Sequence, residues 1–115
     1  MKGDEERVFW LKRYQDALAK CMEAQKEGKA LFRKAHELDA SGAPVDDIAG
    51  IVDQLIKLVT NCRKEETTCI NELIRLGDVP NIERLTSSYE DRSEKTDSFL
   101  TQAILFKDGL KQREN

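Results

Sequence analysis

Histidine is nearly absent from this chain of 115 residues, since His36 is the only one. This scarcity excludes a metal centre with several histidine ligands, and it leaves a Ser-His-Asp or Cys-His site with a single candidate base. No apolar run approaches the roughly 20 residues needed to span a bilayer, and the first six residues lack the apolar core of a signal peptide. We therefore expect an intracellular, cytoplasmic protein without direct membrane insertion.

A surplus of positive charge is also missing, because 19 basic residues face 22 acidic ones and leave a formal net charge of −3. A nucleic-acid-binding protein needs surplus cations to neutralise phosphates, so we expect no nucleic-acid partner. The three cysteines, Cys21, Cys62 and Cys69, are an odd number without the close spacing of a secreted disulfide framework. A reducing compartment is the simpler interpretation.

Two prolines and two glycines divide the chain. Gly42 precedes Pro44, and Gly77 precedes Pro80. A glycine can end a helix in the left-handed conformation, and a proline suits the first turn of the next helix. Strong helix formers fill the stretches between, and no alternating β-branched pattern appears. These signals predict three helices, over residues 4–40, 44–76 and 80–113.

Each predicted helix carries an apolar stripe at the spacing of a helix face, and the second stripe is interrupted by a polar run over residues 63–68. Long helices joined by short loops run antiparallel to their neighbours in sequence. We therefore expect an all-α fold, an up-down-up antiparallel three-helix bundle. It should form a single domain over residues 1–115, with residues 1–3 and 114–115 as frayed ends.

One strongly polar residue breaks the stripe of the third helix. Alignment of the helices from their loops places Arg92 level with Glu65 or Glu66, in the polar run of the second helix. We expect a partly buried ion pair between Glu66 and Arg92, which would oppose a slipped register because a slip leaves a charge unpaired. The alternative is that the arginine reaches solvent along its methylene stem.

The candidate catalytic residues do not assemble into a site. Cys21 and Cys62 are expected at one level of the bundle, but His36 lies near its far end and Cys69 is about 10 Å from Cys62 along the helix. These four side chains cannot converge on a zinc ion. Neighbouring carboxylates on a helix point about 100° apart, so they cannot act together as the general acid and general base of one site. We expect no enzyme activity, no cofactor and no metal; a reactive thiol at Cys21 or Cys62 is the catalytic alternative.

Apolar residues beside the stripes are candidates for binding. Grooves bordered by such residues can hold an amphipathic partner helix, with anchors at i, i+3, i+4 and i+7. Wider core stripes would explain most of these residues equally well. Apolar density is highest at the end of the bundle that contains the first loop. The candidate partner-binding residues are Phe32, Ile48, Ile104, Leu105 and Phe106.

One strip of the first predicted helix is basic. It contains Lys26, Lys29 and Arg33, with Lys34 beside them. A solvated helix face paired with local acids explains the strip, because opposite charges three or four positions apart interact on a helix. An acidic partner segment is the alternative interpretation.

Two fragments resemble a known family. Residues 34–42, followed by a second helix, and residues 89–94 in a third are similar to stretches of microtubule-interacting and trafficking domains. These are three-helix modules that bind short helical tails of membrane-remodelling proteins. The first predicted helix is much longer here, and the second lacks the family's usual tyrosine and alanine pattern. Spectrin-like repeats share the plan of three long helices and often an early tryptophan, as Trp10 is here.

The sequence favours a non-catalytic helical-bundle module for protein–protein interaction, with a coiled-coil-like seam. Such a module would serve as an adaptor, scaffold or subunit of a larger assembly and bind a helical protein segment. The resemblances imply a trafficking or cytoskeletal module as one alternative. A homo-oligomeric structural subunit, which buries its exposed apolar residues against another copy, is the other.

Overall fold

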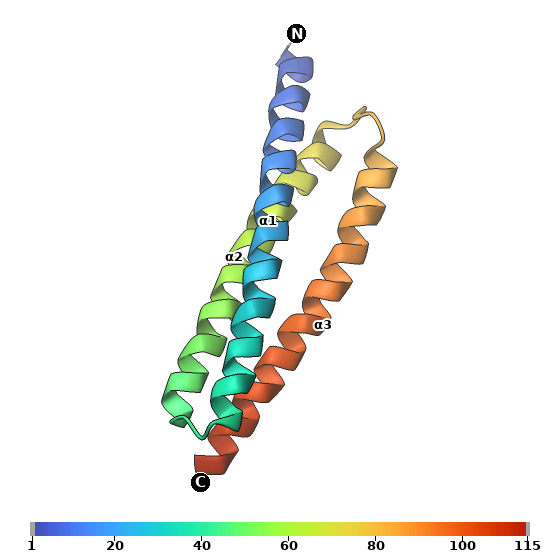
Figure 1. The fold of residues 1–115 in the computed structure, drawn as a ribbon. Coiled ribbons are helices and arrows are strands. Elements are labelled where there is room, and N and C mark those ends of the chain that lie inside the picture. The colour runs from blue at the N-terminus through green and yellow to red at the C-terminus, as the bar shows by residue number, and fades with distance from the viewer. Residues whose placement is uncertain (1, 115) are drawn as a thin grey trace.

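The computed structural model describes residues 2–114, which form three helices and no strand. α1 spans Lys2–Ala40, α2 spans Val45–Leu76 and α3 spans Ile82–Glu114. Consecutive helices run in opposite directions, and the two loops lie at opposite ends of the bundle (Figure 1). The predicted all-α, up-down-up three-helix bundle is confirmed, and no helix end lies more than two residues from its predicted position.

The two ends of the chain are helical as far as the structure describes them. α1 includes residues 2 and 3 and α3 includes residue 114, whereas residues 1 and 115 lie outside the described residues. The fraying of residues 1–3 and 114–115 therefore stays a prediction. Within residues 2–114, no helix has both the length and the apolar character needed to cross a bilayer.

The first loop ends α1 at the predicted glycine. Gly42 has a φ of 81°, in the left-handed region, and the N–H of Ala43 donates to the Leu38 carbonyl. Pro44 is the N-cap of α2, and its carbonyl accepts hydrogen bonds from the N–H groups of residues 47 and 48. The proline thus stands one residue before the helix, close to the predicted first turn.

The second loop contains three residues with positive φ. Gly77 has a φ of 70°, and Asp78 and Asn81 have values of 52° and 61°. Asp and Asn tolerate this conformation better than other non-glycine residues. Because Asn81 is left-handed, the helix cannot include it, and α3 begins at Ile82 rather than at Pro80 as predicted.

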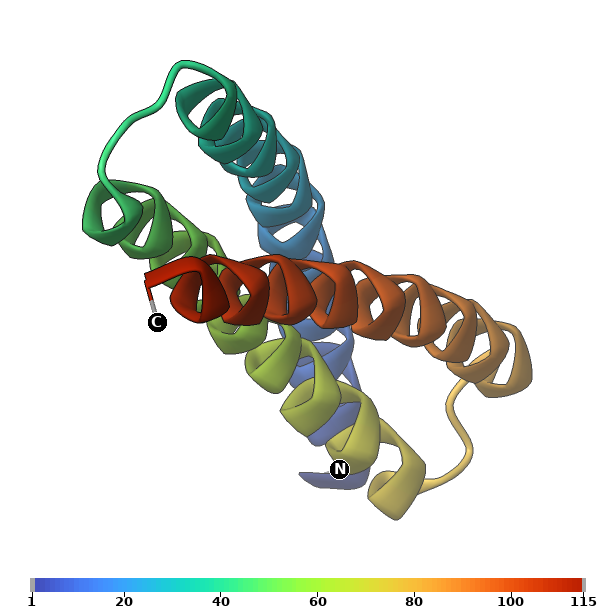
Figure 2. The same ribbon diagram turned by 90° about the horizontal axis from the view of Figure 1, so that it is seen from below.

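α1 and α2 form the closest pair of helices. They run side by side, while α3 lies across them at an angle, so that its N-terminal part diverges from α1 (Figure 1 and Figure 2). Gly28 permits the close approach of α1 to α2, because a β-carbon at this position would lie 3.0 Å from Val59 Cγ2. The contact between α1 and α3 is the weakest in the bundle.

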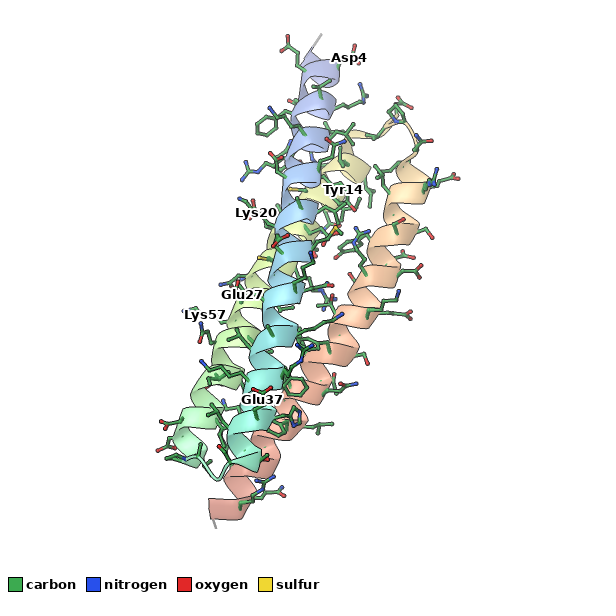
Figure 3. The ribbon with its side chains drawn as sticks, in the orientation of Figure 1. Asp4, Tyr14, Lys20, Glu27, Glu37 and Lys57 are labelled. Atoms are coloured by element: carbon green, nitrogen blue, oxygen red, sulfur yellow. The ribbon has the colours of Figure 1, made fainter. Side chains whose placement is uncertain are left out.

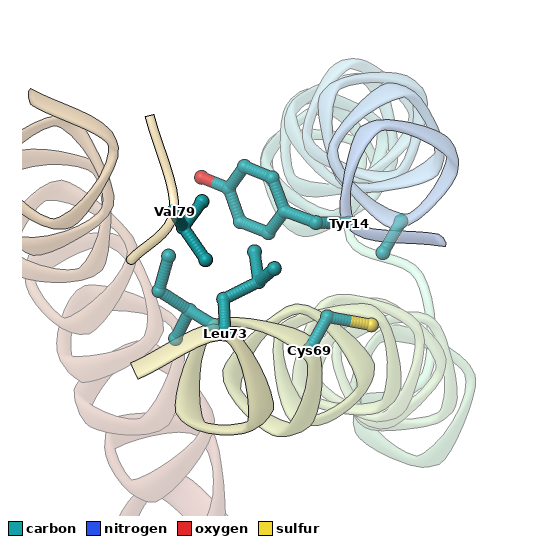
Figure 4. Packing of buried hydrophobic residues seen from close by; sticks show 6 residues of the cluster. Tyr14, Cys69, Leu73 and Val79 are labelled. Atoms are coloured by element: carbon teal, nitrogen blue, oxygen red, sulfur yellow. The ribbon is translucent and has the colours of Figure 1, made fainter. Parts of the chain in front are cut away.

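The apolar core consists of two clusters at opposite ends. Near the second loop, Tyr14, Leu73 and Val79 meet from α1, α2 and the loop itself (Figure 4). Near the first loop, residues of all three helices form the other cluster. Its buried members are Ala35, Ile48, Val52, Leu55, Ala103 and Leu110. The middle of the bundle, between the clusters, is where the buried polar residues lie.

Candidate functional site

The middle layer joins all three helices through polar side chains. Glu66 of α2 is only 4% exposed, and its carboxylate accepts a hydrogen bond of 2.5 Å from Arg92 of α3. The same guanidinium nitrogen donates to the hydroxyl of the buried Tyr14 of α1, at 2.6 Å. The structure thus contains the ion pair expected between Glu66 and Arg92, and the guanidinium turns inward instead of reaching solvent.

Tyr14 was not predicted as a member of this layer. Its ring belongs to the cluster near the second loop, while its hydroxyl reaches the polar layer. A tyrosine on an apolar stripe indicates core packing, and a buried hydroxyl needs a hydrogen-bond partner. That second requirement is the signal that could have linked Tyr14 to Arg92.

A second polar contact lies next to this layer. Gln25 of α1 donates to the hydroxyl of Thr96 of α3 over 2.8 Å, and Thr96 is buried. Arg92 Nε is also buried and has no hydrogen-bond partner among the described residues. A small hollow here is lined by residues of all three helices, including Cys21, Gln25, Glu66, Arg92 and Thr96.

All three cysteines are free thiols with raised pKa values. Burial, together with the nearby Glu66 carboxylate, raises the pKa of the Cys21 thiol to about 12. Burial is also the main cause of the raised pKa values of Cys62 and Cys69. A thiol that stays protonated at neutral pH is a poor nucleophile. Residues 2–114 also hold no group of three or more histidine, cysteine and acidic side chains placed to bind a metal ion.

Two of the predicted partner-binding residues belong to an aromatic cluster between α1 and α3. The rings of Phe32 and Phe106 meet edge to face with centroids 5.6 Å apart, and Phe99 packs against Phe32 in the same way at 5.7 Å. The ring of His36 lies 4.3 Å from that of Phe106. Phe32 and Phe106 are half-buried, and both also pack against the core cluster near the first loop.

Ile48 is wrong as a partner-binding residue. Its side chain is 1% exposed and belongs to the core cluster near the first loop, so no partner can reach it in this structure. The high apolar density in this part of the sequence reflected the core. Ile104 and Leu105 differ, since they are 45% and 64% exposed.

A narrow hollow of about 100 Å³ lies between α1 and α3, next to the polar layer. Val59 of α2 and Phe99 supply its apolar part, and Lys29 and Lys95 stand on its two walls. We call this hollow the α1/α3 groove; its lining residues are Gln25, Lys29, Val59, Lys95, Thr96 and Phe99.

Grooves between helices were expected from the sequence, but the position of this one was not. The available signal was polar: Gln25 and Thr96 stand on the sides of their helices that face one another and form a hydrogen bond, where a continuous apolar seam would have had apolar side chains. Gly28 of α1 is buried close to Phe99 of the groove lining, and it has no side chain to fill the space.

The ion pairs between helices all involve α3 among the described residues. Arg63 of α2 pairs with Asp97, and Lys107 pairs with Asp53 of α2. At the C-terminal end, Arg113 pairs with Asp39 of α1 at 2.6 Å. Hydrogen bonds from these arginines hold the pKa values of the Asp97 and Asp39 carboxyls below their ordinary value. No ion pair joins α1 to α2 within residues 2–114.

Comparison of the chain with known protein families, with curated proteins and with solved structures found no match.

Proposed function

We propose that this chain is a non-catalytic protein–protein interaction module that binds a helical segment of another protein in the α1/α3 groove. In this role it serves as an adaptor or as a subunit of a larger assembly. The observation that carries the proposal is the groove itself. The backbones of α1 and α3 come close at few points, although side chains such as Phe32 and Phe106 join them, and the space between the two helices has an apolar floor formed by Val59 and Phe99.

The hollow spans about one turn of α1 and one turn of α3, which run in the same direction (Figure 1). A partner helix that lies over both can place an apolar anchor in the hollow and further apolar side chains beside it at helical spacing. Met22, which is 58% exposed, stands three residues before Gln25 on α1 and is an exposed apolar side chain outside the groove lining. The alternative site around Phe32 and Phe106 is less suitable, because these rings already cover one another.

The protected state of the thiols supports a non-catalytic role. Cys21 has a pKa of about 12 and lies in the polar layer beneath the groove. Its protonated thiol does not favour nucleophilic chemistry at neutral pH.

Binding in the groove can be tested with a designed helical peptide. The peptide would be about 16 residues long, with leucine anchors at helical spacing and a polar face of glutamine. In two-dimensional NMR spectra of the ¹⁵N-labelled protein, we expect shift changes that saturate and that concentrate at Gln25, Lys29, Val59, Thr96 and Phe99. Absence of saturable binding, or shift changes elsewhere on the bundle, would contradict the proposal.

A blocking variant and a matched control make this test specific. Gln25→Trp places an indole in the groove, and we expect it to weaken peptide binding at least tenfold, that is by about 1.4 kcal/mol. Glu23→Trp introduces the same side chain at an exposed position of α1 outside the groove lining and should leave binding unchanged. Equal loss in both variants would show that the peptide does not occupy the groove.

A homo-oligomeric subunit is the second candidate. The exposed side chains of Ile104 and Leu105 favour it, because adjacent apolar residues on one helix can bury against another copy. Sedimentation velocity at several concentrations tests this candidate. A monomer that does not change with concentration would exclude it, whereas an association that Leu105→Lys abolishes would support it.

A further inference from the structure

We infer that the helical segment bound in the α1/α3 groove is acidic, with glutamate or aspartate side chains on both sides of an apolar anchor. The inference rests on the function proposed above, because it specifies the partner of the same groove. It follows from the basic residues that border the groove and from the position of most acidic residues on other sides of α1 and α3.

The charged residues that line the groove are both basic. Lys29 stands on the α1 wall and Lys95 on the α3 wall, and the other lining residues are neutral. Both lysines are exposed, and neither has an ion-pair partner among the described residues. Their ammonium groups are therefore available to a ligand on either side of the apolar floor.

On α1, acidic residues lie away from the groove. At 100° per residue, Arg33 stands within about 40° of Lys29, whereas Glu27 stands about 160° from it. Glu27 contributes to the raised pKa of Cys62, which places it against α2. Figure 3 shows Glu27 and Lys20 on the side of α1 away from α3. The groove wall of α1 thus carries only positive charge between Leu18 and His36.

On α3, most acidic residues near the groove lie toward α2; the exception is Asp91, which is four positions before Lys95 and about 40° from it around the helix. Glu90, Glu94 and Asp97 line a separate, shallow depression together with Arg63 of α2. Lys95 stands on the other side of the helix and faces the groove. The helix therefore carries most of its negative charge on its α2 side, whereas Lys95, with Asp91 one turn before it, stands on its α1 side. A positive groove in a chain with a net charge of −3 is a local feature, and it is complementary to carboxylates.

The apolar floor defines the rest of the ligand. Gln25 and Thr96 are hydrogen-bonded across the groove, so a leucine or methionine side chain that enters between them displaces this hydrogen bond and then contacts Phe99 and the buried Val59. Because adjacent turns of a bound helix lie about 5.4 Å apart, acidic residues three or four positions from this anchor fall beside it on the helix surface. They can then approach Lys29 on one wall and Lys95 on the other.

The experiment compares three labelled peptides that share the leucine anchors and differ only on the polar face. One carries glutamate, one glutamine and one lysine, and binding is followed by fluorescence polarisation. We expect the glutamate peptide to bind about tenfold more tightly than the glutamine peptide, since each of two or three exposed ion pairs contributes up to about fivefold. The lysine peptide should bind more weakly than both. Raising NaCl from about 50 mM to about 500 mM should remove most of the difference.

Two double variants locate the effect. Lys29→Glu with Lys95→Glu reverses the groove charge and should reverse the order of the peptides, so that the lysine peptide binds most tightly. Lys57→Glu with Lys64→Glu changes the net charge equally at exposed positions of α2 outside the groove lining. This control should retain the preference for glutamate. Since all four lysines are exposed, circular dichroism should show both variants as helical as the original protein.

The outcomes separate this inference from the function on which it rests. If the glutamate and glutamine peptides bind in the groove with equal affinity, the acidic partner is overturned and the helix-binding function stands. If the two double variants change the order equally, net charge rather than the groove is responsible, and the inference is again overturned. If no peptide binds saturably, the proposed function itself fails. If the groove charge governs self-association in sedimentation, the occupant is a second copy and not an acidic partner.

Discussion

The buried carboxylate of Glu66 is the negative charge of the polar layer. Arg92 is its only ion-pair partner within residues 2–114. Arg92→Met should lower the free energy of unfolding by about 3 kcal/mol, because a buried charge left without its partner is strongly unfavourable. Urea denaturation at pH 7 measures this loss.

Two further variants show whether the loss comes from the unpaired charge. The double variant Glu66→Leu with Arg92→Met removes both charges and should recover most of the stability, since an apolar pair of similar volume often replaces a buried ion pair without cost. Tyr14→Phe removes only the hydroxyl that accepts from Arg92 and should cost about 1–2 kcal/mol. A double variant no more stable than Arg92→Met would contradict this account.

The reactivity of the thiols gives a second test at the scale of single residues. With a pKa of about 12, Cys21 carries almost no thiolate at neutral pH. We expect Cys62, which is only half-buried, to react first with a thiol reagent, and Cys21 and Cys69 to react only on unfolding. Mass spectrometry of the labelled peptides gives the order. Fast labelling of Cys21 in the folded protein would favour the catalytic alternative, a reactive thiol at this position.

The partner of a single residue was predictable where the register of the antiparallel helices alone determined it. Arg92 and Glu66 could be paired from the sequence, because loop lengths fix which levels of antiparallel helices coincide. Ile48 could not be assigned correctly, because apolar character at a stripe is the same for a core residue and for a surface anchor. The packing of the three helices covers Ile48 of α2 and leaves Leu105 of α3 exposed.

At the scale of the helices, three glycines within them provide matched probes of packing. Gly50 of α2 and Gly109 of α3 have open space where a β-carbon would stand. Gly50→Ala and Gly109→Ala should each raise the free energy of unfolding by about 0.5–1 kcal/mol, because alanine favours the helix. At Gly28, a β-carbon would lie 3.0 Å from the stiff side chain of Val59. We therefore expect Gly28→Ala to be destabilising by about 1 kcal/mol, since overpacking outweighs the helix propensity.

Denaturation of the three variants under the same conditions gives the comparison. An increase in stability for Gly28→Ala equal to that for Gly50→Ala would show that α1 and α2 are not as close as the structure has them. Unchanged spectra by circular dichroism would confirm that each variant keeps its helices.

Helix boundaries were predictable because their causes are local. Gly42 and Gly77 stop the helices through their own backbone conformations, and each proline follows within three residues. The angle of α3 was not predictable in the same way, because it depends on how side chains from three helices fit together. The α1/α3 groove is a product of that angle, so the sequence indicated grooves in general but not this one.

For the whole molecule, the attachments of the helices differ in kind. α1 and α2 pack closely through an apolar interface without an ion pair among the described residues. α3 packs less closely against them: it places Ala103 and Leu110 in the core cluster near the first loop, and the Glu66–Arg92 pair and three more exposed ion pairs join it to the other helices. Exposed ion pairs contribute little to stability, typically less than about 1 kcal/mol each. The bundle should therefore open first by release of α3, while the pair of α1 and α2 remains.

Native-state hydrogen exchange measures this order directly. We expect the slowest amides of α3 to open with a free energy at least about 1 kcal/mol below that of the slowest amides in α1 and α2. Asp97→Asn, which breaks the pair with Arg63, should lower the opening free energy of α3 and leave that of α1 and α2 nearly unchanged. One common opening free energy for all three helices would contradict this order, because it would mean that α3 leaves only when the whole bundle unfolds.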